Sequence, residues 1–221
     1  MMKRAIFTLI GLVVLVSFSS AAMAATEGSA VSGDLAQQKL IVGNKRYVDA
    51  KPSHPNQTVQ HRTEVAKGQH PFAAIVSCAD SRVPPEILFD QGLGDLFVIR
   101  LAGNILNDAA LGSLEYAVEH LGVKYIMVLG HERCGAVDAT LKGGEAPGHI
   151  GSLVNAIQPA VEKAKNQPGD PLDNAVRANV TMVVQQLKSS EPILEGRVKK
   201  GDLTVVGARY DLDDGVVAIL P

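Results

Sequence analysis

The chain has 221 residues, 46% of them hydrophobic, and a formal net charge of −2 at pH 7. This length and apolar content predict one α/β domain with enough material for a core. No block of basic residues is present, which argues against nucleic acid as a partner, and no repeat occurs at solenoid spacing.

The first residues predict an export signal. Residues 1–4 are a short basic segment, residues 5–18 are apolar, and residues 22–24 (Ala-Met-Ala) match an A-x-A cleavage site. We therefore expect a Sec signal peptide at residues 1–24, a periplasmic mature protein and no stable membrane anchor after cleavage. The alternative is an uncleaved anchor, because residues 5–26 carry no charge and are long enough to span a bilayer.

The mature chain is expected to begin with a flexible lead, residues 25–33, followed by a single domain over residues 34–221. Asp34 can cap a helix at the start of this domain. That helix carries one apolar stripe, made by the i, i+7 pairs Leu40/Tyr47 and Ile41/Val48. Residues 51–60 contain two prolines and are expected to form a loop.

Strands and helices alternate along the rest of the chain. Apolar runs rich in β-type residues predict three buried strands, near residues 72–78, 95–100 and 124–130. Helices are expected between and after them, at residues 108–121, 135–143, about 150–165 and about 171–189. Two late strands, at about 203–209 and 215–220, read as a hairpin-like pair. This order predicts an α/β fold with a mixed, mostly parallel β-sheet flanked by helices.

Two cysteines and a histidine follow two of the predicted strands. Cys78 closes one apolar run, and His131 and Cys134 come directly after another. If the two strands are parallel neighbours, these side chains meet at the carboxyl edge of the sheet, where open α/β sheets place their ligand sites. Two thiolates and one imidazole leave one coordination position open, which is the ligand count of a catalytic zinc site.

A disulfide between Cys78 and Cys134 is the alternative in an exported protein. Zinc is favoured for three reasons. His131 stands at ligand spacing from Cys134, both cysteines lie at or just past the ends of predicted buried strands, and the neighbouring Asp80/Arg82 pair has no role in a disulfide.

The segment Cys78-Ala-Asp80-Ser-Arg82, followed by His131-x-x-Cys134-Gly135, resembles the β-class carbonic anhydrases. The resemblance covers roughly residues 35–220. Further segments agree with it: Lys67-Gly-Gln69, Gly94 to Arg100, Ala102-Gly-Asn104 and Ser113 to Val118. One departure is Leu101, where the family usually has Asn; it concerns a local hydrogen bond rather than the metal site.

The resemblance implies the β-carbonic anhydrase fold and the reversible hydration of CO₂ to bicarbonate and a proton. Zinc would lower the pKa of its bound water and make hydroxide available at neutral pH. Asp80 is then expected to accept a hydrogen bond from that hydroxide, while Arg82 holds the Asp80 carboxylate in a bidentate pair and keeps it off the metal. Taken alone, the Asp80/Arg82 pair would be an ordinary surface salt bridge.

The match to the family's pocket also implies five positions for binding CO₂ or bicarbonate: Gln69, Phe97, Ala102, Tyr116 and Gly135. Phe97 and Tyr116 can also be core residues, and Gln69 a loop cap. In the family, some pocket residues come from a partner subunit and the first helix lies across that partner, so a homodimer or a dimer of dimers is expected. The family's allosteric subgroup lines its bicarbonate pocket with a tryptophan, which this chain lacks, so an open site is expected.

Two other functions remain as alternatives. A related hydrolase acting on COS or CS₂ would share the fold and the metal site. A non-catalytic zinc- or bicarbonate-binding protein would need no group to orient hydroxide, so the Asp80/Arg82 pair argues against it.

Overall fold

The computed structural model describes residues 31–221. The expected signal peptide at residues 1–24, and the lead up to residue 30, lie outside the described residues. Among residues 31–221, no helix combines the length and the apolar character that crossing a membrane requires.

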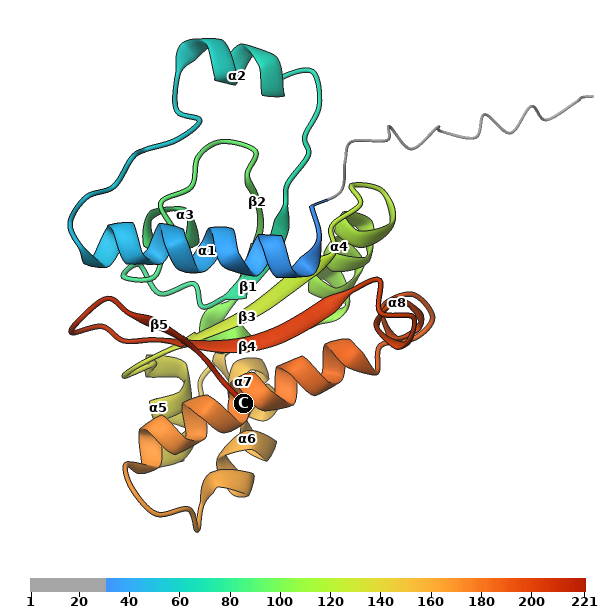
Figure 1. The fold of residues 1–221 in the computed structure, drawn as a ribbon. Helices are drawn as coiled ribbons and strands as arrows, with labels where there is room; N and C mark the ends of the chain where they lie inside the picture. The colour runs from blue at the N-terminus through green and yellow to red at the C-terminus, as the bar shows by residue number, and fades with distance from the viewer. Residues whose placement is uncertain (1–30) are drawn as a thin grey trace, which may run out of the picture.

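A five-stranded sheet forms the centre of the molecule (Figure 1). Its strands are β1 (Ala73–Ser77), β2 (Leu96–Arg100), β3 (Tyr125–His131), β4 (Thr204–Tyr210) and β5 (Val217–Ile219). The strand order is β2-β1-β3-β4-β5; the first four strands run parallel, and β5 pairs antiparallel with β4. The predicted fold class and the hairpin-like end are therefore confirmed.

Helices cover both faces of the sheet, with α1 on one side and α5, α6 and α7 on the other (Figure 1). They are α1 (Gly33–Val48), α2 (Val59–Val65), α3 (Pro85–Leu88), α4 (Asp108–Glu119), α5 (Gly135–Lys142), α6 (Ile150–Ala164), α7 (Pro171–Lys188) and α8 (Leu194–Lys199), with a 3₁₀ turn, η1, at Ala102–Asn104.

Alternate residues of the central strands point to opposite faces, as the pleat of a strand requires. Ile75 and Met127 belong to the core cluster that includes Leu40 of α1. Val76 and Val128 belong to the cluster that includes α4, α7 and α8. Because both faces are covered, β1 and β3 are buried along their whole length.

The start of α1 differs from the prediction. Ser32, not Asp34, caps the helix, because the Ser32 hydroxyl accepts the backbone N–H of Leu35 at 3.3 Å. Asp34 lies in the first turn, where its charge still complements the positive end of the helix.

The predicted stripe of α1 is only half correct. Leu40 is fully buried, and the Tyr47 hydroxyl lies 3.1 Å from that of Tyr210. Ile41 and Val48, in contrast, are more than one third exposed. The two pairs lie one residue apart along the chain, about 100° around the helix, so they cannot both face the sheet.

The sequence prediction missed three short helices, α2, α3 and α8. The expected loop at residues 51–60 ends two residues early, because α2 begins at Val59, capped by the Thr58 side chain. The helix expected at residues 135–143 is confirmed, and Gly143 closes it with φ at +69°.

Candidate metal centre

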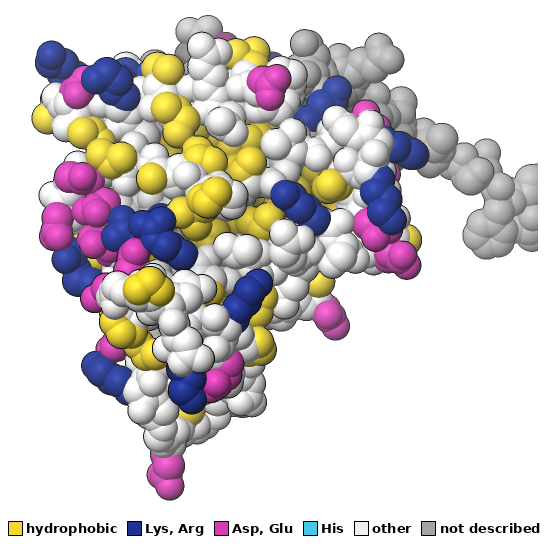
Figure 2. Space-filling model, turned by 60° about the horizontal axis from the view of Figure 1, so that its bottom comes forward, with side chains coloured by type: hydrophobic (Ala, Val, Ile, Leu, Met, Phe, Trp, Pro, Cys, Tyr) yellow, Lys and Arg dark blue, Asp and Glu magenta, His cyan; other side chains and the backbone are white. Residues whose placement is uncertain are grey.

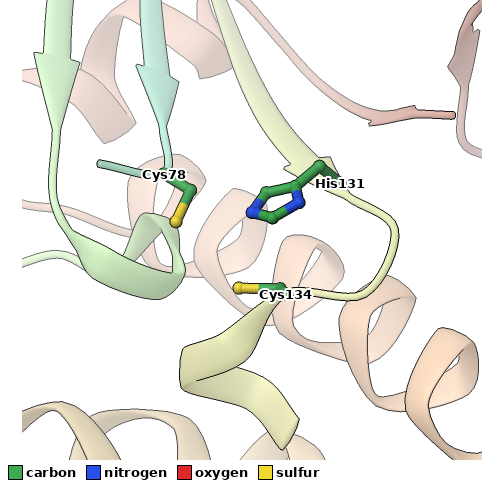
Figure 3. A group of neighbouring side chains, drawn as sticks. All are labelled: Cys78, His131 and Cys134. Atoms are coloured by element: carbon green, nitrogen blue, oxygen red, sulfur yellow. The ribbon is translucent and has the colours of Figure 1, made fainter. Parts of the chain in front are cut away.

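Neighbouring parallel strands bring the predicted ligands together. β1 pairs with β3 in a register that sets Ser77 opposite Leu129, so Cys78 leaves the sheet beside the end of β3, where His131 lies. The chain then turns through residues 132 and 133, and Cys134 is the N-cap of α5. The ligand atoms of the three residues all lie within 4.8 Å of one another and point toward a common centre (Figure 3).

The chemistry of these three side chains fits a bound zinc ion. All three are buried, and both cysteines are free thiols rather than a disulfide. Nε2 of His131 is buried without a hydrogen-bond partner, although buried polar atoms are nearly always paired. Its other nitrogen, Nδ1, lies 2.8 Å from the carbonyl of Glu132, which leaves Nε2 as the lone-pair donor. An unpaired imidazole nitrogen between two thiols is therefore a site prepared for a soft cation.

The Cys78 sulfur lies in a field of backbone donors. The N–H groups of Gly103 and Asp80 approach it at 3.2 and 3.4 Å. A hydrogen bond from the Cys134 thiol, with these backbone N–H groups, lowers the pKa of Cys78, whereas the adjacent Cys78 sulfur and burial raise the pKa of Cys134. One thiol thus loses its proton readily, and the second needs a compensating positive charge.

The Asp80/Arg82 pair is formed and lies beside the ligands. Arg82 Nε and Nη2 donate to the two carboxylate oxygens of Asp80 at 2.9 and 2.7 Å, and the Arg82 backbone N–H adds a third hydrogen bond at 2.9 Å. The Arg82 side chain lowers the pKa of Asp80, so the carboxylate stays ionised at neutral pH. Asp80 Oδ2 is 3.8 Å from His131 Nε2, so the pair is not a remote surface salt bridge.

Arg100 fixes the backbone that carries these residues. Its Nε donates to the carbonyl of Cys78 at 2.9 Å, and its Nη2 donates to the carbonyl of Asp80 at 2.5 Å. The sequence indicated Arg100 only as part of a motif. Its role could not be predicted, because every residue has a backbone carbonyl and no side-chain pattern shows which carbonyl Arg100 contacts.

A second group of missed residues supports the His131 side of the site. The Glu132 carboxylate bonds Arg209 at 2.8 Å, and Arg209 also pairs with Asp173 and Asp211. Because the Glu132 carbonyl is the partner of His131 Nδ1, this network holds the peptide that orients the imidazole. Glu132 and Asp211 also form an acidic group with Asp213, but arginines already neutralise its carboxylates.

The predicted substrate positions fall into two groups. Ala102 precedes the Gly103 N–H that bonds the Cys78 sulfur, and Gly135 directly follows Cys134. Phe97 and Tyr116 form an aromatic pair with ring centroids 6.4 Å apart, and Tyr116 is 46% exposed. Gln69 is exposed in the loop after α2. Within residues 31–221, no hydrogen bond links Gln69 to the metal ligands.

Leu101 takes part in the local hydrogen bonding through its backbone. Its N–H donates to the carbonyl of Ser77 at 3.1 Å, and its carbonyl accepts the N–H groups of Ala79 and Asn104 at 3.3 and 2.8 Å. These bonds do not depend on the side chain, so leucine is accommodated at this position.

The comparisons with known proteins all indicate the same family. A family model described as carbonic anhydrase matches residues 73–217. Carbonic anhydrase 2 of Mycobacterium tuberculosis is 44% identical over 184 residues, which cover 81% of this chain and 89% of that protein. A carbonic anhydrase of Mycolicibacterium smegmatis is 40% identical over 188 residues, covering 83% of this chain and 91% of the relative.

Solved structures show the same similarity. The β-carbonic anhydrase CcaA superposes with a TM-score of 0.67 at 29% identity, covering 84% of this chain and 95% of that one. The Coccomyxa β-carbonic anhydrase, solved with acetazolamide, gives a TM-score of 0.67 at 31% identity, covering 82% and 84%. A tetrameric enzyme from Sordaria macrospora shares the fold, with a TM-score of 0.68 at 23% identity over 83% of this chain and 96% of that one.

Proposed function

This chain belongs to the β-carbonic anhydrase family and is a carbonate dehydratase, and we propose that it hydrates CO₂ with a zinc ion held by Cys78, His131 and Cys134. The single observation that carries the proposal is the buried Cys₂His group whose imidazole Nε2 has no partner within the described chain. Three protein ligands leave one position for the reacting water, as catalytic zinc sites do.

Zinc bound there would supply a water whose pKa is lowered from about 16 toward about 7. The residues of the chain supply the rest. Asp80 is ionised and is an acceptor only, so its Oδ2 can take a hydrogen bond from the attacking oxygen and direct the lone pair of that oxygen toward CO₂. Arg82 occupies both carboxylate oxygens and keeps Asp80 from becoming a fourth ligand.

The substrate needs little from the protein, because CO₂ carries no charge. Ala102 directly precedes Gly103, whose N–H bonds the Cys78 sulfur, and Gly135 directly follows Cys134. Both residues are small, so they leave room beside the reacting oxygen. We propose that Phe97, Tyr116 and Gln69 complete the pocket, with some of them contributed by a second copy of the chain. The exposure of Tyr116 and Gln69 in the single chain supports this assembly as a homodimer or a dimer of dimers.

The relatives favour CO₂ over the two alternatives. Those reported above are named as carbonic anhydrases, and none of these names refers to COS or CS₂ hydrolysis or to non-catalytic binding. The formed Asp80/Arg82 pair also supports catalysis over simple binding of zinc or bicarbonate, because binding needs no orienting acceptor.

We also propose that the mature protein works in the periplasm, on the basis of the Ala-Met-Ala cleavage site at residues 22–24. N-terminal sequencing of the protein from the producing cells is expected to begin near Ala25 or Thr26. A membrane-bound protein that still starts at Met1 or Met2 would show an anchor instead.

The proposal is tested by stopped-flow CO₂ hydration on zinc-loaded protein, with elemental analysis of the same sample. About one zinc per chain and rapid hydration are expected, both lost in Cys134→Ser. Full zinc content in that variant would contradict the ligand assignment. A native mass spectrum showing a Cys78–Cys134 disulfide would contradict it more directly.

A further inference from the structure

Asn179 of α7 is fully buried, yet only half of its amide is used. Its Nδ2 donates to the carbonyl of Gly103 at 2.8 Å, from a position 76 residues away in the sequence. Its Oδ1 is buried without a partner. An unpaired buried oxygen is unfavourable, and an apolar side chain of the same shape would not carry it. What remains specific to asparagine at this position is therefore the N–H donor.

The residue that receives this hydrogen bond touches the metal centre. The Gly103 N–H points at the Cys78 sulfur at 3.2 Å. Gly103 has φ at +69°, and a Cβ there would come within 2.6 Å of Ile157 Cδ1, so only glycine fits this close approach. Because one residue carries both groups, fixing its carbonyl also restrains the direction of its N–H.

A hydrogen bond to a thiolate changes how the thiolate binds a metal. The N–H draws electron density from sulfur, and hydrogen bonds of this kind tune metal–thiolate centres. In a Cys₂His site, two thiolates already donate much charge to the ion. A donor aimed at Cys78 thus moderates that donation.

We propose that Asn179 is a positioning residue for the metal centre: by holding the Gly103 carbonyl, it aims the Gly103 N–H at the Cys78 sulfur and sets how strongly that thiolate donates to the metal. The inference rests on the proposed zinc site. It adds a residue from α7, which carries no ligand itself.

Another buried asparagine provides a matched control. Asn44 of α1 donates to the carbonyls of Leu88 and Gly215 at 3.0 and 2.9 Å and accepts the N–H of Val217 at 2.9 Å. It joins three segments of the fold, and none of its hydrogen bonds within residues 31–221 involves a proposed ligand or Gly103. A variant at Asn44 therefore reports the cost of losing a buried amide that is not hydrogen-bonded to the residues around the proposed ligands.

The test compares Asn179→Leu with Asn44→Leu, two near-isosteric changes, in the full mature protein. Zinc affinity is measured by competition with a chromophoric chelator, and the cobalt-loaded proteins are examined by absorption. For Asn179→Leu we expect zinc affinity to fall by about 10- to 100-fold, the usual effect of losing an outer-shell partner, because Gly103 and the Cys78 sulfur are no longer held in the geometry that binds the metal, and this loss of positioning outweighs the stronger donation of the thiolate. Its sulfur-to-cobalt charge-transfer band should move to longer wavelength, because the thiolate electrons are less stabilised. Asn44→Leu should change neither property, even if it destabilises the fold. Wild-type affinity and an unshifted band in Asn179→Leu would overturn the inference.

A measurement on the wild-type protein covers the case in which Asn179→Leu does not fold. In protein loaded with NMR-active cadmium, the Gly103 amide proton should show scalar coupling to the metal through the Cys78 sulfur. Bound cadmium without that coupling would overturn the inference and leave the proposed function standing. Failure of the wild-type protein to bind zinc or cadmium would instead overturn the proposed function, and the inference with it.

Discussion

Asp80 faces the candidate metal centre and Arg82 at the same time, which makes it the most informative residue to change. Asp80→Asn keeps the shape but can present an amide donor where an acceptor is needed. CO₂ hydration should fall by about 10²-fold or more, the range seen when a positioned catalytic group is lost. Zinc content should be retained, because Asp80 is not one of the three proposed ligands. Full activity with zinc present would end the mechanism proposed for Asp80.

Arg82 should affect the CO₂ hydration activity only through its effect on Asp80. Arg82→Ala frees the Asp80 carboxylate to move onto the metal, so hydration activity should fall. Adding Asp80→Asn to this variant should cost little more, because the two residues act as one unit. A double-mutant cycle measured by stopped flow decides the point. Losses that simply add would mean that the pair is a structural salt bridge.

Single residues differ in how far the sequence reveals them. Cys78, His131 and Cys134 could be placed together because each follows a strongly apolar run and all are ligand types. Arg100 and Asn179 could not, because each acts on a backbone carbonyl of a distant segment. Only the fold determines which carbonyl is within reach, so side-chain patterns carry no record of these contacts.

At the scale of elements, Arg209 ties β4 to α7 and to the loop after β3. Its side chain is 12% exposed and meets the carboxylates of Glu132, Asp173 and Asp211 at 2.8, 2.5 and 3.1 Å. Because Glu132 also carries the carbonyl that orients His131, this network links the stability of the fold to the geometry of the metal centre.

Arg209→Met should therefore be strongly destabilising. It leaves three carboxylates close together without their shared cation, and we expect a loss of about 3 kcal/mol in the free energy of unfolding at neutral pH. Urea unfolding measures this loss. Arg177→Met is the control, because Arg177 is 44% exposed and, within residues 31–221, pairs with Asp173 only, one helical turn away. Its loss should be about 0.5 kcal/mol or less.

The effect of Arg209→Met should also depend on pH. Burial opposes the shift, but hydrogen bonds from Arg177 and Arg209 hold the pKa of Asp173 below its ordinary value. A carboxylate with a lowered folded pKa contributes stability above its unfolded pKa, about 3.9, and loses it as the pH falls through the folded value. The difference in the free energy of unfolding between wild type and Arg209→Met should thus be largest at pH 7 and should become smaller below about pH 4. A difference that stays constant down to pH 3 would mean that the charges of this network contribute little to the stability of the fold.

Elements with a long apolar signal could be predicted, and short ones could not. The runs behind β1, β3 and β4 placed those strands to within about two residues, because a buried parallel strand is apolar throughout. α2 buries none of its residues, and α3 has only four, so neither shows an amphipathic period. At α1, Ser32 and Asp34 are both good caps, and local sequence does not decide between them.

At the scale of the whole molecule, apolar side chains remain on the surface of the single chain. Figure 2 shows hydrophobic side chains gathered across one face, with Lys and Arg side chains beside them. α1 alone exposes Leu35, Ile41, Val42 and Val48. α2 buries no residue, exposes 69% of Val59, and stands away from the sheet in Figure 1. Exposed apolar surface of this extent is typical of a subunit interface.

Val42→Glu should weaken the proposed assembly. Val42 is 49% exposed on α1, and a buried, unpaired carboxylate there would oppose association. Light scattering after size-exclusion chromatography should give a multiple of the chain mass for the wild type, which is 23.3 kDa less the proposed signal peptide, and a smaller mass for the variant. Ile150→Glu on α6, at a site 50% exposed, should leave the mass unchanged. A wild-type protein that runs as a single chain would contradict the assembly itself.

The parallel strands also have amino-terminal ends, and these lie on the side of the sheet away from the candidate metal centre. β4 begins opposite the start of β3, and the proposed ligand His131 lies at the far end of β3, about 20 Å along the strand. The turn before β4 at Lys200 and Gly201 is exposed, and nothing lies within 4 Å of a Cβ built at Gly201. Such turns accept inserted sequence well. An affinity tag or a surface-attachment peptide placed between these two residues would anchor the enzyme by the edge opposite its catalytic centre, so that an immobilised CO₂-capture catalyst would present its metal site to the solution.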